Sequence, residues 1–337
     1  MKAAVFIGER QFKIEDLPVP VAEPDGVVVR VRASGICGSD LHLYRHARDV
    51  RLIFGHEFSG DVVAVGERVV GVKAGDRVTA MSGRGCGECY FCRRDDIVHC
   101  SKLQLLGYGV PGAMAEYVSI PVFKMGVYAA ILPDYISYEE GATAEPLSVA
   151  LYAVDQMQPQ AEDTVVVIGL GIIGLCIIQI LKSRGVKNVI ASGRRATRLK
   201  LAGDCGAAVV VDAEKADVVR VVRNFTGGTG ADIVFECAGT PDTFRQSLEI
   251  VHRGGKINIV GLYEQPVNWS PSIIVSNDIT LVGCGLKFDI PGAVSLLAER
   301  KVDTRPFITH EFPLERIKEA YDTQLQNKEA IKVVVKP

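Results

Sequence analysis

The sequence predicts an α/β protein in which a β-rich N-terminal part precedes a doubly wound parallel sheet. The chain has 337 residues, about two domains on the usual scale of roughly 100 to 200 residues each. Short β-type runs separated by Gly and Pro extend to about residue 145, and strands alternate with helices from about residue 150. The hydrophobic content of 48% and the charged content of 23% are those of an ordinary globular chain.

The N-terminal part is expected to be a barrel or a sandwich. Strands are predicted over 27–31, 61–65 and 77–80, because β-branched residues gather there between turn-forming residues. Several short strands separated by such turns are typical of an all-β domain that closes on itself or stacks two sheets.

The second part is expected to be a parallel sheet covered by helices. An apolar strand over Val165–Ile168 leads into a helix over Ile172–Arg184. Later strands are predicted over 188–192, 208–211, 232–236, 256–260 and 280–282, with a charged helix starting at 196. This alternation implies a doubly wound sheet, because parallel neighbours need a crossover connection. The last fifty residues add helices near 291–300 and 315–326 and a strand over 331–335, which periodicity assigns to neither part.

Charge and cysteine usage exclude several classes of function. With 38 Lys+Arg against 40 Asp+Glu, the chain offers no global basic field for nucleic-acid binding. The uncharged stretch 164–181 is long enough for a membrane span, but its glycines and β-branched start favour a buried strand, turn and helix. Glu9 and Arg10 interrupt the N-terminus before the apolar core of a signal peptide forms. Nine cysteines without an export signal therefore predict a cytoplasmic location.

A glycine-rich turn connects the first strand of the second part to its helix. It reads Gly169-Leu170-Gly171-Ile172-Ile173-Gly174, and a strand before and a helix after give it the context of a dinucleotide-binding fingerprint. The first glycine permits the tight turn, the second lets a pyrophosphate approach the backbone, and the third lets the helix pack on the strand. A tight turn without a ligand is the alternative. We predict cofactor binding by Gly169, Gly171, Ile172, Ile173 and Gly174.

The end of the next strand predicts which cofactor binds. About 20 residues after the glycines, NAD-binding chains usually present an acidic residue to the ribose 2′-hydroxyl. This chain reads Ser192-Gly193-Arg194-Arg195, without a carboxylate. The small residues leave room, and the arginines can neutralise a 2′-phosphate, so we predict NADP in preference to NAD. The alternative is a solvated helix start, although cations there oppose the helix dipole unless an anion is bound.

Four cysteines predict a structural metal site in a lobe over residues 82–102. Their spacing is Cys86-x2-Cys89-x2-Cys92-x7-Cys100. Four thiolates close a tetrahedral zinc site with no open position, as a structural zinc requires. An iron–sulfur cluster and inert thiols are the alternatives, and the usual cluster-binding spacings differ from this one.

A second set of potential metal ligands is scattered along the N-terminal part. Cys37 lies in one segment, His56 and Glu57 in a second, and Glu145 in a third. One Cys, one His and one Glu make three protein ligands and leave a fourth position for water or substrate. By spacing alone a purely structural role is an equal alternative. No HExxH helix or G-x-S-x-G turn is present in the sequence, so hydrolase functions are disfavoured.

Five ordered motifs together resemble the zinc-containing medium-chain dehydrogenase/reductase family, and within it the sorbitol, threonine and sugar-alcohol-phosphate dehydrogenase branch. They are GICGSDLH, GHEFSG, the four-cysteine lobe, AEPLSVAL and GLGIIG, in this order, and the resemblance spans essentially the whole chain. The resemblance implies a GroES-like catalytic domain over 1–147, a Rossmann domain over 148–286, and a segment over 287–337 that returns to the catalytic domain. Relatives are commonly dimers or tetramers, so a homo-oligomer is expected.

The resemblance also implies roles for single residues. It places the catalytic zinc on Cys37 and His56, with Glu57 as a direct or exchanging ligand and Glu145 bound directly or through water. Asp40 matches the carboxylate that orients the ligating imidazole.

The proton path is implied in the same way. Ser39 matches the hydroxyl that receives the substrate proton, and His42 is a plausible relay to solvent. The expected protein is thus a zinc-dependent oxidoreductase, with one catalytic and one structural zinc, that interconverts a secondary alcohol and a ketone with NAD(P). A non-catalytic NAD(P)-binding zinc protein of the same fold and a nucleic-acid-binding zinc module are the alternatives.

Overall fold

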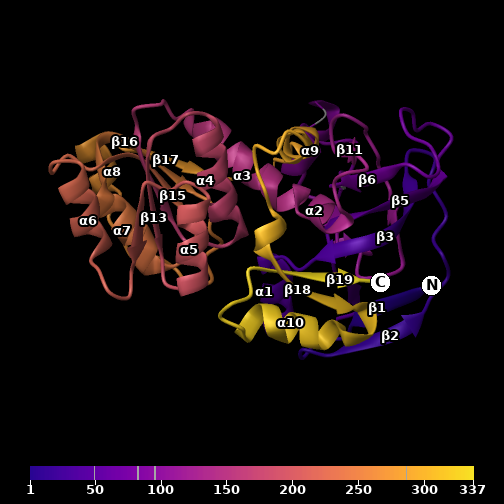
Figure 1. The fold of residues 1–337 in the computed structure, drawn as a ribbon. Helices are drawn as coiled ribbons and strands as arrows, with labels where there is room; N and C mark the ends of the chain where they lie inside the picture. The colour runs from indigo at the N-terminus through magenta and orange to yellow at the C-terminus, as the bar shows by residue number, and fades with distance from the viewer. Residues whose placement is uncertain (49, 82, 95, 286) are drawn as a thin grey trace. The chain divides into compact units, whose positions relative to one another are not determined.

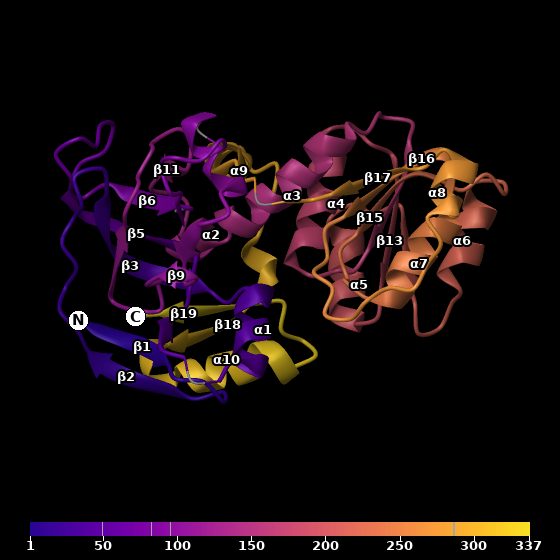
Figure 2. The ribbon, with the colours of Figure 1, turned by 180° about the vertical axis from the view of Figure 1, so that it is seen from behind.

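Two units of different architecture make up the structure. The structure is a computed structural model, and it describes residues 1–48, 50–81, 83–94, 96–285 and 287–337. Unit 1 comprises residues 1–148, 288–300 and 304–337, and unit 2 comprises residues 149–287 and 301–303. Figures 1 and 2 show the first as the β-rich part and the second as a sheet with helices on both faces. Ser82, where the predicted zinc lobe starts, and Leu286, where the predicted nucleotide domain ends, lie outside the described residues.

Unit 1 is built on a mixed sheet with the strand order β11-β6-β5-β3-β19-β18, in which β10 also pairs with β3. These strands are β3 (Val27–Gly35), β5 (Glu57–Val65), β6 (Arg77–Ala80), β10 (Tyr117–Ile120), β11 (Ala129–Ile131), β18 (Ile308–Pro313) and β19 (Lys332–Lys336). The last strand pairs with β3 at Val334 and Gly35. Figure 1 shows it in yellow beside the indigo N-terminal strands. The C-terminal end of the chain therefore completes the sheet that the N-terminal residues begin.

A second sheet and several helices complete unit 1. Strand β1 (Lys2–Phe6) pairs with β2 (Phe12–Asp16) and with β4 (Leu52–Ile53). The helices are α1 (Gly38–His46), α2 (Tyr138–Ala142), α9 (Ile290–Ala298) and α10 (Ile317–Gln326), and α3 (Ala144–Met157) begins here and continues into unit 2. An aromatic cluster of Phe6, Tyr44, Phe54 and Tyr321 joins β1, α1 and α10 in one core. Each of these rings is fully buried, so the cluster fixes α1 firmly against the sheet.

The cysteine lobe is a small excursion from unit 1. Strands β7 (Gly83–Arg84), β8 (Gln104–Leu106) and β9 (Gly109–Val110) pair in that order, and the four cysteines lie between the first two. The short 3₁₀ turns Cys92–Arg94 and Ile97–His99 link the cysteines. Of these four cysteines, Cys100 is buried.

Unit 2 is a parallel sheet with the strand order β14-β13-β12-β15-β16-β17. The strands are β12 (Thr164–Ile168), β13 (Asn188–Gly193), β14 (Val209–Asp212), β15 (Ala231–Glu236), β16 (Val251–Ile259) and β17 (Thr280–Gly283). The helices are α4 (Ile172–Ser183), α5 (Ala196–Asp204), α6 (Val218–Phe225), α7 (Pro241–Ile250) and α8 (Ser272–Asn277). The predicted doubly wound sheet is confirmed.

The strand order reverses between β12 and β15, which are neighbours in the sheet. In such sheets ligands bind outside the carboxyl ends of the strands at this reversal. The uncharged stretch 164–181 is divided between strand β12 and helix α4. Among the described helices, none is both long and apolar enough to cross a membrane.

Candidate active site

The turn between β3 and α1 gathers three polar side chains. Cys37 is the last residue before α1 and has an extended backbone. Its backbone N–H donates to the Asp40 carboxylate at 3.2 Å, and the Ser39 hydroxyl donates to the Cys37 sulfur at 3.2 Å. A single turn of chain therefore presents a thiol, a hydroxyl and a carboxylate together.

The antiparallel pairing of β3 with β5 brings the second segment to this turn. Gly35 faces Glu57 across the two strands, so His56 and Glu57 lie beside Cys37. The ligand atoms of Cys37, His56 and Glu57 all lie within 4.8 Å of one another. Gly55, with φ at +101°, makes the approach possible, because a Cβ there would lie 2.8 Å from the Ser34 hydroxyl. Sulfur, imidazole and carboxylate form a donor set that suits zinc.

The electrostatics of this group favour a bound cation. His56 is largely buried, and its Nδ1 has no hydrogen-bond partner but lies 3.6 Å from Asp40 Oδ1. Burial lowers the pKa of His56, but the negative charges of Asp40 and Cys37 outweigh this effect and hold the pKa well above its usual value. A buried imidazole surrounded by negative groups is the arrangement expected where a metal ion binds.

Glu145, at the start of α3, is buried but is not in the three-residue ligand group. Burial raises the pKa of Glu145 to about 7, a shift that the positive charge of His56 opposes and the negative charge of Glu57 supports. The carboxyl group is thus electrostatically coupled to the site. The structure brings Cys37, His56 and Glu57 into direct reach of one ion and leaves Glu145 further out.

Lys332 is a residue of this site that the sequence did not reveal. Its ammonium group donates to Glu57 Oε2 at 2.5 Å and to the Ile36 carbonyl at 2.8 Å, and both charged side chains are buried. Burial lowers the pKa of Lys332, but the charge of Glu57 more than compensates and raises it above the usual value. The two partners are 275 residues apart in sequence. A lysine within a run of valines near the C-terminus was the only signal.

Tyr108 is a second residue that the motifs did not reveal. Its hydroxyl donates to Asp40 Oδ1 at 3.4 Å, and its ring centre lies 5.8 Å from that of His56. His42, on the first turns of α1, is exposed, and its ring centre lies 4.9 Å from that of His46. The structure therefore shows Asp40 buried beneath the site, Ser39 at its edge and His42 at the surface of the same helix.

The four cysteines of the lobe form a separate group. The sulfur atoms of Cys86, Cys89, Cys92 and Cys100 all lie within 4.8 Å of one another, as a tetrahedral zinc site requires. The backbone N–H of Cys92 donates to the Cys89 sulfur at 3.4 Å, and this bond lowers the pKa of Cys89 to about 6. Burial raises the pKa of Cys92 to about 12, so it is the gathering of the four sulfur atoms, and not a common shift of their pKa values, that indicates a metal site.

The glycine turn of unit 2 has the geometry of a nucleotide-binding site. Gly169 has φ at +98°, and a Cβ there would lie 2.8 Å from the backbone of Cys237 and Ala238. A Cβ on Gly174 would collide with the Gly169 carbonyl oxygen, so the helix packs closely on the turn. At Gly171, the N-cap of α4, a Cβ would meet no atom within 4 Å. This open space beside a helix N-terminus fits a pyrophosphate.

The predicted 2′-phosphate residues lie at the same edge of the sheet. The Gly169 N–H donates to the Ser192 carbonyl at 2.9 Å, which joins the glycine turn to the end of β13. Ser192 is buried, Arg194 is exposed, and Arg195 is the N-cap of α5 without a side-chain capping bond. The first turn of α5 contains no acidic residue. Two arginines therefore stand at a helix N-terminus with no local carboxylate in that turn.

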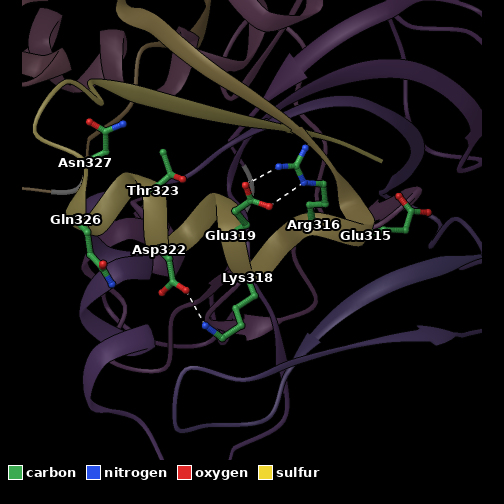
Figure 3. A pocket seen from close by; sticks show the side chains of 8 residues that line it. All are labelled: Glu315, Arg316, Lys318, Glu319, Asp322, Thr323, Gln326 and Asn327. Atoms are coloured by element: carbon green, nitrogen blue, oxygen red, sulfur yellow. Dashed lines mark hydrogen bonds and ion pairs between the residues drawn. The ribbon is translucent and has the colours of Figure 1, made fainter.

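A surface cavity of about 680 Å³ along α10 belongs to neither site. Figure 3 shows that its charged side chains pair with one another along the helix, Arg316 with Glu319 and Lys318 with Asp322. Such exposed pairs one helical turn apart are ordinary surface features. The lining residues are Glu315, Arg316, Lys318, Glu319, Asp322, Thr323, Gln326 and Asn327.

Comparison with known proteins gives consistent matches along the whole chain. Residues 23–129 match the family described as alcohol dehydrogenase GroES-like domain, and residues 173–299 match the family described as zinc-binding dehydrogenase. Sorbitol dehydrogenase of Bacillus subtilis is 35% identical, over 100% of this chain and 97% of that protein. D-arabitol-phosphate dehydrogenase of Enterococcus avium is 36% identical, over 97% and 94%. The structure of an alcohol dehydrogenase from Thermus sp. ATN1 superposes with a TM-score of 0.90 at 33% identity, over 100% and 99%.

Proposed function

The chain belongs to the zinc-containing medium-chain dehydrogenase/reductase family, in the branch of the sorbitol and sugar-alcohol-phosphate dehydrogenases, and on that premise we propose that Cys37, His56 and Glu57 hold its catalytic zinc. The protein is an oxidoreductase that interconverts a secondary alcohol and a ketone by hydride transfer with NAD(P). The observation that carries the site assignment is the convergence of three ligand atoms from two strand ends within 4.8 Å. Glu145, outside that group, acts as a ligand through water.

The chain's own side chains organise the proton transfer. Zinc bound here supplies a Lewis acid that lowers the pKa of an alcohol. The Ser39 hydroxyl, 3.2 Å from the Cys37 sulfur, accepts the hydroxyl proton of the substrate as it gives up its own towards the exposed His42, which releases a proton to solvent. The charge of Asp40, 3.6 Å from His56 Nδ1, orients the His56 ring, and Tyr108 in turn donates to Asp40. Removal of this proton, together with a hydride from the adjoining carbon, leaves the ketone.

We also propose a second zinc in the lobe, an NADP preference and a homo-oligomer. The gathered sulfurs of the lobe support a structural zinc, and the basic N-terminus of α5 supports NADP. The homo-oligomer, a dimer or a tetramer, is proposed because members of the family commonly form dimers or tetramers. A cytoplasmic location is supported by nine cysteines that are all free of disulfides.

The substrate is proposed to be a polyol, a sugar alcohol or an amino alcohol. The relatives named above act on sorbitol and on D-arabitol phosphate. Glu145 stands where classical alcohol dehydrogenases have a second cysteine, which favours the polyol branch. A non-catalytic role finds no support, because the ligands of an open metal site are gathered in the structure.

Replacing Cys37 by Ser tests the metal site. The Cys37→Ser variant should lose turnover, and its zinc content should fall from about two to about one ion per chain, because one of three protein ligands is removed. Its affinity for nicotinamide nucleotide, followed through the emission of Trp269, the single tryptophan, should stay unchanged. The matched control is Cys205→Ser, a thiol of unit 2 outside both clusters. Full activity of Cys37→Ser would refute the proposal.

A further inference from the structure

A fully buried carboxylate joins the loops at the nucleotide-binding edge of unit 2. Glu236 is the last residue of β15 and has no exposed surface. Its Oε1 accepts from the backbone N–H of Ala238 at 2.9 Å and of Gly239 at 3.0 Å. Its Oε2 accepts from the Tyr263 hydroxyl at 2.5 Å. One side chain thus organises the loop after β15 and binds a residue of the loop after β16.

The backbone of the same residue reinforces this connection. The Glu236 carbonyl accepts from the N–H groups of Val260 and Gly261, at 2.8 and 2.9 Å. Gly261 packs so tightly that a Cβ there would collide with the backbone of Gly239 and lie 2.9 Å from Glu236 Oε2. The loop after β15 is therefore held between the carboxylate and the loop after β16.

The loop after β15, residues 237–239, packs against the start of the glycine turn. The Cys237 N–H donates to the Ile168 carbonyl at 2.8 Å, directly before the turn. A Cβ on Gly169 would lie 2.8 Å from Ala238 N and from the Cys237 carbonyl carbon. Any movement of residues 237–239 therefore moves the backbone against which Gly169, the first residue of the glycine turn, is packed.

If residue 236 only filled space in the apolar core, an apolar side chain would serve, and no acidic group would be needed. Burying a carboxylate is unfavourable unless hydrogen bonds replace its water, and a buried polar network fixes one arrangement when every member is satisfied. A carboxylate accepts from several N–H and O–H donors at once, whereas an amide of the same shape must turn its own donor towards some of them. The chemistry of Glu236 thus matches the set of donors around it.

We propose that Glu236 is a positioning residue for the nucleotide: with the Tyr263 hydroxyl it fixes residues 237–239, and through them the glycine turn that receives the pyrophosphate. The inference rests on the proposed nucleotide site of unit 2. It assigns no contact between Glu236 and the nucleotide itself. Its effect is on cofactor affinity, through the loop it holds.

Glu236→Gln keeps the size of the side chain but replaces one acceptor oxygen by an NH₂ donor. The side chain can then accept from only some of the surrounding donors. The dissociation constant for reduced NADP, measured by energy transfer from Trp269, should rise about tenfold, the effect of losing one charge-assisted hydrogen bond. Tyr263→Phe should raise it roughly threefold, because one hydrogen bond is lost. Turnover at saturating cofactor and the KM for the alcohol should be unchanged, and amides 237–239 should exchange hydrogen faster.

The matched control is Thr226→Val, which removes a hydrogen bond from the Gly230 N–H to a side chain elsewhere in unit 2 and should leave the dissociation constant unchanged. A folded Glu236→Gln variant with wild-type affinity would overturn the inference. If that variant does not fold, the affinity of Tyr263→Phe decides in the same way. Failure of the wild-type protein to bind any nicotinamide nucleotide would overturn the proposed function instead.

Discussion

At the scale of the residue, Glu57 shows how a long-range contact completes a local motif. The motif places Glu57 next to His56, but the buried partner of its carboxylate is Lys332, on the last strand. Gly35 is part of the same arrangement, because a Cβ there would collide with Glu57 Oε2. Two buried charges in contact stabilise little by themselves, yet removing one of them leaves the other without compensation.

Lys332→Met should therefore destabilise unit 1 strongly. We expect the free energy of unfolding to fall by about 3 kcal/mol, the usual cost of leaving a buried charge unpaired. Urea unfolding followed by far-UV circular dichroism measures the change. Lys328→Met, at an exposed position of the loop before β19, is the control and should change the stability by less than about 0.5 kcal/mol. Equal effects of the two substitutions would contradict the importance of the ion pair.

At the scale of the element, helix α5 begins with an unfavourable charge. Its N-cap is Arg195, Arg194 precedes it, and no acidic residue follows in the first turn. The partial positive charge of a helix N-terminus repels cations, so the helix gains most when an anion binds there. The end of β13, directly before these arginines, carries the small residues Ser192 and Gly193 and no carboxylate. These features together support a 2′-phosphate as the anion.

Replacing both arginines tests this explanation. Arg194→Ala/Arg195→Ala should raise the KM for NADP by about 100-fold and the KM for NAD by less than about threefold, because NAD lacks the phosphate that the guanidinium groups neutralise. Steady-state kinetics with both cofactors measures the split. Arg220→Ala, an exposed arginine of α6, is the control. A similar rise for both cofactors would remove the argument for NADP.

At the scale of the whole molecule, features formed by residues close in sequence can be predicted from the sequence, whereas contacts between residues far apart in sequence cannot. The glycine turn and the four cysteines are local patterns, and the structure brings each of these sets together as its spacing indicated. The predicted fold class is confirmed by the sheet topology. It could be predicted because its signals, alternating strands and helices, are also local. The contacts of Lys332 with Glu57 and of Tyr108 with Asp40 depend on strand register and on chain crossings, which no short pattern contains.

The C-terminal strand offers the most direct test of how the whole chain builds the site. Deleting residues 331–337 removes β19, whose valines are buried in unit 1, together with Lys332. The catalytic zinc should then be lost, because β3 loses a neighbour and Glu57 its partner. The lobe should keep its zinc, since its four ligands lie within fifteen residues of sequence. Metal analysis should therefore give about one ion per chain.

Unit 2 should be spared in the same truncated protein, because its sheet contains no strand from the C-terminal segment. Titration with reduced NADP, read from Trp269, should give wild-type affinity while turnover is absent. A chain shortened only by Pro337 is the control and should keep two zinc ions and full activity, since β19 ends at Lys336. Retention of two zinc ions by the longer deletion would show that the N-terminal ligand segments assemble without the last strand.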